Sequence, residues 1–125
     1  MKFMSFNCRG MAGSLKRPAL KRLVCAEHPD IIMLQETLGI SEEVKKWLEK
    51  LLPGWHFEAL DVRGRSGGLA IGWNERNIKP SKVWGMESVL GLSFSTRESK
   101  DIFTILNVYG PYLDRRPFWE NLFSK

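Results

Sequence analysis

Long apolar runs are absent from this sequence of 125 residues. The hydrophobic stretches are far too short to cross a bilayer, and the N-terminus becomes polar without the apolar core of a secretion signal. Cysteine is also scarce, since the chain has Cys8 and Cys25 alone. Two cysteines fit a reducing compartment and exclude a disulfide-rich scaffold, so we expect buried thiols and neither a disulfide nor a cysteine metal site. These absences predict a soluble intracellular protein that does not contact a membrane.

Acidic residues are fewer than basic residues, and none precedes Glu27. The chain has 14 acidic and 19 basic residues, which gives a formal net charge of +5. The basic residues that precede Glu27 are Lys2, Arg9, Lys16, Arg17, Lys21 and Arg22. Such a cluster attracts phosphate backbones by counterion release, although a basic surface of this size is also typical of a solvated face. DNA is therefore a candidate partner. The cluster is too sparse to predict a nuclear signal, which leaves a nuclear location open.

Hydrophobic residues are plentiful enough for one folded domain. They make up 43% of the sequence and include five Trp and seven Phe, so the chain can build a core. No internal repeat, low-complexity tract or clear linker divides it. The pattern predicts an α/β fold, in which strands and helices alternate at first and short strands follow.

The first part of the chain predicts a strand over residues 2–8 and a helix over residues 18–27. Alternating apolar positions indicate the strand, and Pro18 is tolerated only near the start of a helix. The side chains expected to face the core from these two elements are Met4, Phe6, Cys8, Leu20, Leu23 and Val24. A continuous apolar run within residues 30–36 is typical of a strand buried on both faces. Strand, helix and strand in succession predict a right-handed βαβ unit with parallel strands.

Polar side chains end both of these strands. Asn7 closes the first, and Gln35 and Glu36 close the second. Because parallel strands end at the same rim of a sheet, we expect Asn7 and Glu36 to lie together there, where ligands bind in open α/β sheets. One carboxylate with neighbouring carboxamides suits Mg²⁺, which keeps several of its waters. The alternative is that Glu36 only marks the point where the strand reaches solvent.

The remaining sequence predicts a second helix and then a run of short strands. Ser41 is expected to cap this helix, whose apolar stripe includes Trp47 and which ends at Pro53. Strands are predicted over residues 55–60, 68–73, 78–84, 89–95 and 102–109 as antiparallel hairpins, with a final helix over residues 115–123. Asn107 and Tyr109 are two apart in the last strand and share one face. A tyrosine hydroxyl there can hydrogen-bond a phosphate oxygen as charge develops on it.

Three segments in this order resemble a known family. They are residues 6–10 (FNCRG), 34–37 (LQET) and 107–111 (NVYGP), and they resemble motifs of the endonuclease/exonuclease/phosphatase superfamily, which has the deoxyribonuclease-I-like fold. Residues 66–70 and the segment Arg116-Pro117-Phe118-Trp119 look most like the apurinic-type endonuclease domain of plant non-LTR (LINE-type) retroelements. The resemblance runs from Met1 to the final residues.

The resemblance implies a fold and a set of site residues. The fold is the N-terminal half of a four-layer α/β sandwich, with mixed β-sheets and flanking helices. Glu36 would be the Mg²⁺ ligand, with Mn²⁺ as an alternative ion, and Asn7 would orient that site and the scissile phosphate. Tyr109 would bind the phosphate in the transition state, and Asn107 would support Tyr109. The family's chemistry is in-line attack of an activated water on a phosphodiester, in which the metal stabilises the leaving oxygen.

The sequence departs from the resembled family in two places. Arg9 stands where the base-excision-repair branch has an acid, which fits the retroelement branch better. The later motifs, a Gly-Asp-x-Asn and a terminal Ser-Asp-His, have no counterpart, since the last aspartate is Asp114 and the histidines are His28 and His56. We expect both histidines to be structural, because one lies at a helix end and the other alternates within an aromatic strand.

Residues 1–125 are therefore expected to form a partial domain that is truncated before the later catalytic motifs and is weakly active or inactive alone. The missing C-terminal half, or another chain, is expected to cover an apolar sheet face that otherwise stays exposed. Two alternatives stay open. One is a non-catalytic α/β fragment that binds nucleic acid or protein, and the other is a phosphatase of the same superfamily.

Overall fold

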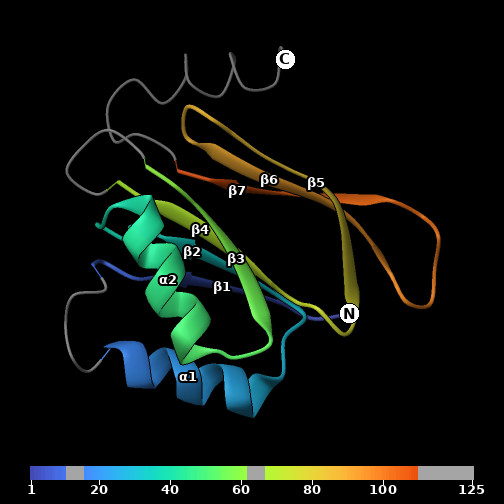
Figure 1. Cartoon of the computed structure of the whole chain (residues 1–125), viewed down its shortest axis with the longest axis horizontal. Helices are drawn as coiled ribbons and strands as arrows, with labels where there is room; N and C mark the ends of the chain where they lie inside the picture. The colour runs from blue at the N-terminus through green and yellow to red at the C-terminus, as the bar shows by residue number, and fades with distance from the viewer. Residues whose placement is uncertain (11–15, 62–66, 110–125) are drawn as a thin grey trace.

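A computed structural model describes residues 1–10, 16–61 and 67–109 (Figure 1). The elements in these residues are β1 (Phe3–Asn7), α1 (Lys16–Glu27), β2 (Ile31–Gln35), α2 (Ser41–Leu51), β3 (Trp55–Leu60), β4 (Leu69–Asn74), β5 (Ile78–Met86), β6 (Val89–Thr96) and β7 (Phe103–Val108). They form a first sheet in the order β1-β2-β4-β3 and a second sheet in the order β5-β6-β7. The predicted elements in the described part of the chain are all present, with ends that differ by one or two residues.

The chain begins with the expected βαβ unit. β1 and β2 are parallel and in register from Phe3 opposite Ile31 to Asn7 opposite Gln35. The other strand pairs are antiparallel, including β3 with β4, β5 with β6, and β6 with β7. The first sheet is therefore mixed and the second antiparallel. This agrees with the predicted succession of alternating strands and helices followed by short antiparallel strands.

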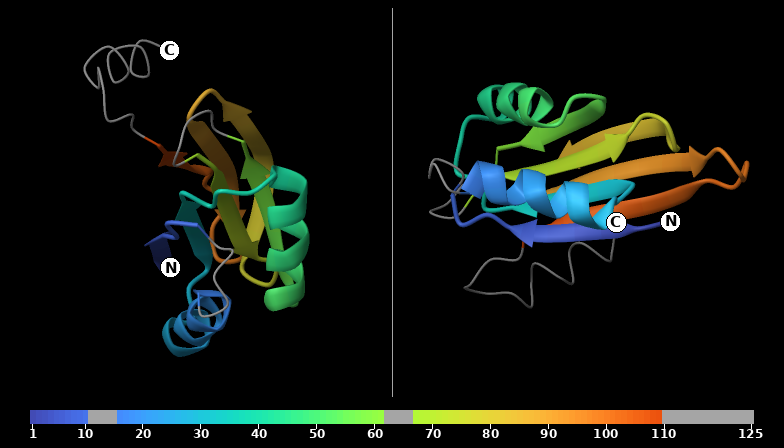
Figure 2. Two further views of the ribbon diagram at one scale, coloured as in Figure 1. Left: turned by 90° about the vertical axis from the view of Figure 1, so that its left-hand side faces the viewer. Right: turned by 90° about the horizontal axis from the view of Figure 1, so that it is seen from below.

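The first sheet is covered on both faces. Both helices pack on one face and the second sheet packs on the other, as Figures 1 and 2 show. The helix-side core contains Cys8, Leu20, Val24, Ile32, Leu34, Val44, Leu48, Leu52, Phe57 and Ala70. The core between the sheets contains Ile31, Leu69, Ile71, Trp73, Ile78, Leu90, Leu92 and Phe94. β2 contributes alternate residues to the two cores, which explains why its sequence is apolar without alternation.

Some expectations about α1 and the cysteines were wrong. The helix begins at Lys16, two residues before the predicted start, and Pro18 is accommodated because N–H groups in the first turn have no helical partner. Leu20 and Val24 are buried, but Leu23 is 38% exposed and does not belong to the core face. Cys8 is buried as expected, whereas Cys25 is exposed.

The start of α2 also differs from the prediction. The N-cap residue is Ile40, which makes no capping bond with its side chain. Ser41 instead donates its N–H to one carboxylate oxygen of Asp61 (2.9 Å) and its hydroxyl to the other (3.1 Å). Asp61, just beyond β3, thus supplies the carboxylate that stabilises the helix N-terminus. Trp47 packs against the helix-side core but is only half-buried, and the Arg17 guanidinium lies 4.5 Å from its ring centre.

One predicted element falls on another part of the chain, since the final helix predicted over residues 115–123 lies outside the described residues. Within the described ranges, neither helix is both long and apolar enough to span a bilayer.

Candidate functional site

The carboxyl ends of β1 and β2 meet at one rim of the first sheet. Asn7, the last residue of β1, lies opposite Gln35, and Glu36 follows directly. Hydrogen bonding continues past the strand ends, since the Cys8 N–H donates to the Gln35 carbonyl and the Gly10 N–H to the Glu36 carbonyl, each at 2.8 Å. The structure therefore brings Asn7 and Glu36 to neighbouring positions, as the parallel strands require.

The turn after β1 is fixed by side chains on both of its sides. The Asn7 side-chain oxygen accepts a hydrogen bond from the Arg9 N–H (3.1 Å), and Arg9 and Gly10 adopt φ of 48° and 89°. From the start of α1, the Lys16 ammonium donates to the carbonyls of Cys8 (2.8 Å) and Arg9 (2.9 Å). Lys16 is thus positioned to hold the turn that carries Asn7.

Glu36 leaves the strand in an unusual backbone conformation. Its φ is 55°, in the left-handed region that costs an ordinary residue roughly 1–2 kcal/mol. The residue is buried, and the chain beyond it is tied to the start of β4, because Thr37 N–H donates to the Gly68 carbonyl and Leu38 N–H to the Gly67 carbonyl. Left-handed residues concentrate at ligand sites, where the surrounding structure must stabilise them.

Asn107 is a buried amide that joins the two sheets. Its side-chain nitrogen donates to the carbonyls of Leu34 (3.0 Å) and Ala70 (2.9 Å), and its oxygen accepts from the Gln35 amide (2.9 Å). These three bonds run from β7 in the second sheet to β2 and β4 in the first. They bring the end of β7 to the same rim as Asn7 and Glu36.

Tyr109 follows β7 and lies at this rim as well. Its N–H donates to the Ser88 carbonyl at 2.9 Å, and its half-buried side chain packs against the core between the sheets. The side-chain bonds of Asn107 go to β2 and β4, and its support of Tyr109 stays a prediction. All four predicted site residues thus lie at the ends of β1, β2 and β7.

The donor set at this rim suits a hard cation. Glu36 supplies one carboxylate and Asn7 one amide oxygen, and no group of three or more His, Cys, Asp or Glu forms within the described ranges. A single carboxylate is enough for Mg²⁺, which retains waters. Cys8 lies beside them, but burial, assisted by the charge of Glu36 and opposed by Lys16, raises the pKa of its thiol to about 12.

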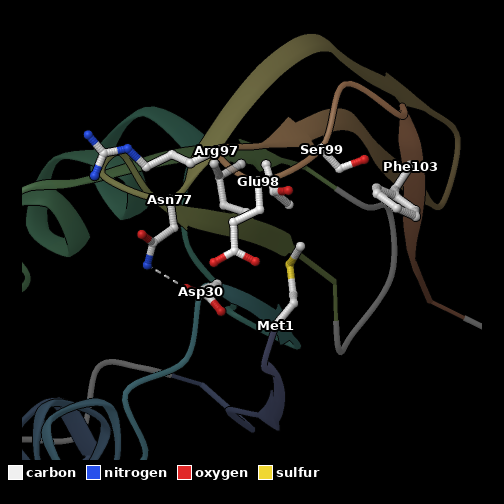
Figure 3. A pocket seen from close by; sticks show the side chains of 9 residues that line it. Met1, Asp30, Asn77, Arg97, Glu98, Ser99 and Phe103 are labelled. Carbon is white, nitrogen blue, oxygen red and sulfur yellow. Dashed lines mark hydrogen bonds between the residues drawn. The ribbon is translucent and has the colours of Figure 1, made fainter.

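A hollow at the opposite rim does not belong to this site (Figure 3). Its volume is about 480 Å³, and it lies at the starts of β2, β5 and β7. Asp30 at its wall is already engaged, with one oxygen bound by the Asn77 amide (2.8 Å) and the other by the Lys2 N–H (2.9 Å). None of the four predicted site residues lines it.

Sequence reasoning missed three residues that build the rim, namely Lys16, Gln35 in its bonding role, and Gly68. Gln35 and Asn107 each interrupt an inward-facing run of apolar residues, and a lone amide in such a place signals a buried partner. Nothing in the sequence signals that Lys16 folds back onto the turn after β1.

Comparisons with known proteins place the chain in a family. A sequence profile of the Endonuclease/Exonuclease/phosphatase family matches residues 4–123. None of the curated proteins compared with the chain matches it in sequence. A mannosyl-6-phosphatase from Bacteroides thetaiotaomicron is similar in structure, with a TM-score of 0.74 and 16% identity over 99% of this chain and 57% of that one. An AP endonuclease from Leishmania major gives a TM-score of 0.65 and 22% identity over 94% of this chain and 43% of that one.

TDP2 from D. rerio, in complex with a single-strand DNA product, has a TM-score of 0.69 and 15% identity over 99% of this chain and 52% of that one. At these identities the solved structures establish the shared deoxyribonuclease-I-like fold, and the chain spans about half of their lengths. The family comprises metal-dependent nucleases and phosphatases. With a family match over nearly its whole length and the corresponding fold, the chain belongs to the endonuclease/exonuclease/phosphatase family.

Proposed function

We propose that the chain is an endonuclease-type domain of plant LINE-type retroelement descent that cleaves phosphodiesters of DNA with Mg²⁺, or Mn²⁺, at the rim of Asn7, Glu36 and Tyr109. The supporting observation is the convergence of three strand ends. The parallel register places Asn7 beside Gln35 and Glu36, and the bonds of Asn107 attach the end of β7 to the same rim. The motif context of residues 66–70 and Arg9 favours the retroelement branch.

Each side chain has a distinct part in this proposal. Glu36 and the Asn7 amide oxygen would hold the ion, which when bound neutralises charge that develops on the leaving oxygen. The Tyr109 hydroxyl donates a hydrogen bond to a phosphate oxygen, and the Asn7 amide orients the same phosphate. The basic residues of α1 and the turn before it, including Arg9 and Arg17, attract the DNA backbone.

Low activity of the chain alone is part of the proposal. The sequence contains no Gly-Asp-x-Asn or Ser-Asp-His motif, and its histidines lie away from the rim. His28 is at the end of α1, and Nε2 of His56, on the edge strand β3, lies 3.0 Å from a Glu75 carboxylate oxygen. The described residues place no general base at the site, and we therefore expect the rate to be lower by several orders of magnitude, because residues that act as a unit lose most of their effect together.

A plasmid-nicking assay with Mg²⁺ tests this function. We expect slow nicking by the wild-type chain and none by Glu36→Gln, which keeps the side-chain shape but removes the charge of the metal ligand. Removal of Mg²⁺ with a chelator is expected to abolish the wild-type activity. Glu98→Gln serves as the charge-matched control, because Glu98 is exposed at the opposite rim (Figure 3) and its loss is expected to leave nicking unchanged.

The outcomes separate the competing functions. Equal nicking by Glu36→Gln and the wild type contradicts the proposed site. DNA binding that weakens with salt, without nicking, favours a non-catalytic nucleic-acid-binding fragment, for which the net charge of +5 is the supporting feature. Release of phosphate from sugar or inositol phosphates, without nicking, favours a phosphatase.

We also propose that the remainder of an endonuclease domain covers the edge formed by β1 and β7. The exposed apolar side chains along this edge are Met1, Phe3, Ile102, Phe103 and Leu106. The edge of β5 is different, since Pro80, a bulge before Lys82 and exposed lysines protect it from pairing. The solved relatives have about as much chain again beyond the matched part, which supports this partner.

Binding of an apolar dye tests the open edge. We expect the isolated chain to bind such a dye or to self-associate, and Leu106→Lys to reduce both, since a lysine blocks strand pairing. Met86→Lys on β5, also at an exposed apolar residue, is the control and is expected to change neither. A cooperatively unfolding monomer that binds no dye contradicts the proposal, as do dye binding and self-association that Leu106→Lys leaves unchanged.

A further inference from the structure

We infer that Asn107 and Gln35 are positioning residues, which fix the three strand ends that carry Asn7, Glu36 and Tyr109. The inference rests on the proposed function only in one respect, namely that the positioned side chains hold a metal ion and a phosphate. Each of the three strands contributes one residue to a chain of hydrogen bonds. In each strand this residue comes one or two positions before the site residue. The members are Ser5 on β1, Gln35 on β2 and Asn107 on β7.

Gln35 is the central member of this chain. Its amide nitrogen donates to Asn107 Oδ1 (2.9 Å) and to Ser5 Oγ (3.1 Å), and its oxygen accepts from Ser5 Oγ (3.3 Å). Both ends of the carboxamide are therefore occupied. A planar amide held at both ends has one orientation, so its backbone, and Glu36 after it, is fixed relative to β1 and β7.

Asn107 connects this chain to the other sheet. It is 2% exposed, and its two side-chain N–H groups are directed to the carbonyls of Leu34 and Ala70. No buried side-chain nitrogen or oxygen lacks a partner among the described residues, so the network is fully satisfied there. A satisfied polar network inside an apolar core fixes one arrangement, because any shift of one sheet over the other leaves a buried group unpaired.

The position of Glu36 makes this support necessary. Its left-handed backbone has left the regular ladder of β2, and Tyr109 belongs to a different sheet. Apolar contacts between the sheets are non-directional, whereas the bonds of Asn107 are directional and set one register between β7 and the end of β2. Without them, Glu36 and Tyr109 have no fixed separation at which to hold a metal ion and a phosphate together.

Hydrogen exchange and Mn²⁺ binding of Gln35→Met test the inference. Methionine keeps the length of the side chain but leaves Asn107 Oδ1 without its donor. We expect exchange at the amides of Cys8, Gly10 and Thr37, which bond across the rim, to rise roughly tenfold, the equivalent of one lost hydrogen bond. Mn²⁺ affinity is expected to fall about tenfold, as is common when a partner of a metal ligand is removed.

Ile78→Val is the control for a general loss of stability. Ile78 is buried in the core between the sheets at the opposite rim, and this change removes one methylene group from that core. We expect it to lower the unfolding midpoint as Gln35→Met does, without changing exchange at the rim amides or Mn²⁺ affinity. Unchanged exchange at these amides in Gln35→Met, or an equal rise in both variants, overturns the inference. If the wild type binds no Mn²⁺, the metal site fails, while the exchange data still decide the positioning role.

Discussion

Replacing Asn107 with leucine is expected to lower the free energy of unfolding by roughly 2–4 kcal/mol, because buried carbonyl groups lose their donor. Leucine keeps the branched shape of asparagine and its number of heavy atoms, so the substitution leaves no cavity and chiefly removes hydrogen bonds. Leu34 and Ala70 lose the N–H groups directed at their carbonyls, and Gln35 loses its acceptor. Urea unfolding followed by tryptophan fluorescence measures the change.

Asn77→Leu provides the same substitution at an exposed site. Asn77 donates one side-chain hydrogen bond, to Asp30, and both groups can bond to water when it is lost. We expect this control to cost about 0.5–1 kcal/mol, the net value of one hydrogen bond. Equal losses of unfolding free energy in the two variants would contradict the view that the buried bonds of Asn107 stabilise the chain more than an exposed side-chain bond does.

Gly68→Ala is expected to destabilise the chain by about 3 kcal/mol and to displace the segment that follows Glu36, since it combines backbone strain with overpacking. Gly68 has a φ of +107°, which side chains rarely adopt. A Cβ atom there would overlap Thr37 Oγ1 and would lie 3.1 Å from the Leu38 backbone nitrogen. The backbone cannot yield as a flexible side chain does, because Leu38 N–H bonds to the Gly67 carbonyl.

Gly54→Ala measures the cost of backbone strain at positive φ without the steric overlap that an added Cβ causes at Gly68. Gly54 has a φ of +86°, but no atom lies within 4 Å of the position of an added Cβ. We expect this variant to lose about 1–2 kcal/mol, the cost of a left-handed alanine alone. Adding Thr37→Ala to Gly68→Ala is expected to recover part of the difference, and independent, additive effects of these two changes would contradict the proposed overlap.

Several parts of the fold could be predicted from the sequence because local patterns determine them. Continuous apolar residues indicated that β2 is buried on both faces, and the βαβ succession placed Asn7 and Glu36 at one rim. Turn residues and β-branched runs located β3 to β7 to within one or two residues. The ends of elements were less predictable, since the first turn of α1 accepts Pro18 as an interior residue and Asp61, distant in sequence, replaces Ser41 as the cap of α2.

The meeting of the predicted site residues at one rim could be predicted, but the bonds that support them could not. Motifs predicted Asn7, Glu36, Asn107 and Tyr109 as site residues, yet the bonds of Asn107 depend on how the two sheets stack, which no local pattern encodes. The hydrogen bonds from Lys16 to the turn after β1 depend on where the first residue of α1 lies relative to that turn. The exposure of Leu23 and Cys25 likewise follows from the placement of α1 over the sheet.

Mn²⁺ titration monitored by electron paramagnetic resonance tests most directly whether Glu36 binds the metal ion. The method counts bound Mn²⁺ without requiring catalysis, so it applies even if the chain alone does not cleave DNA. We predict one saturable site in the wild type and in Glu98→Gln, and a loss of at least about tenfold in affinity in Glu36→Gln. Equal binding by the wild type and Glu36→Gln would contradict the account.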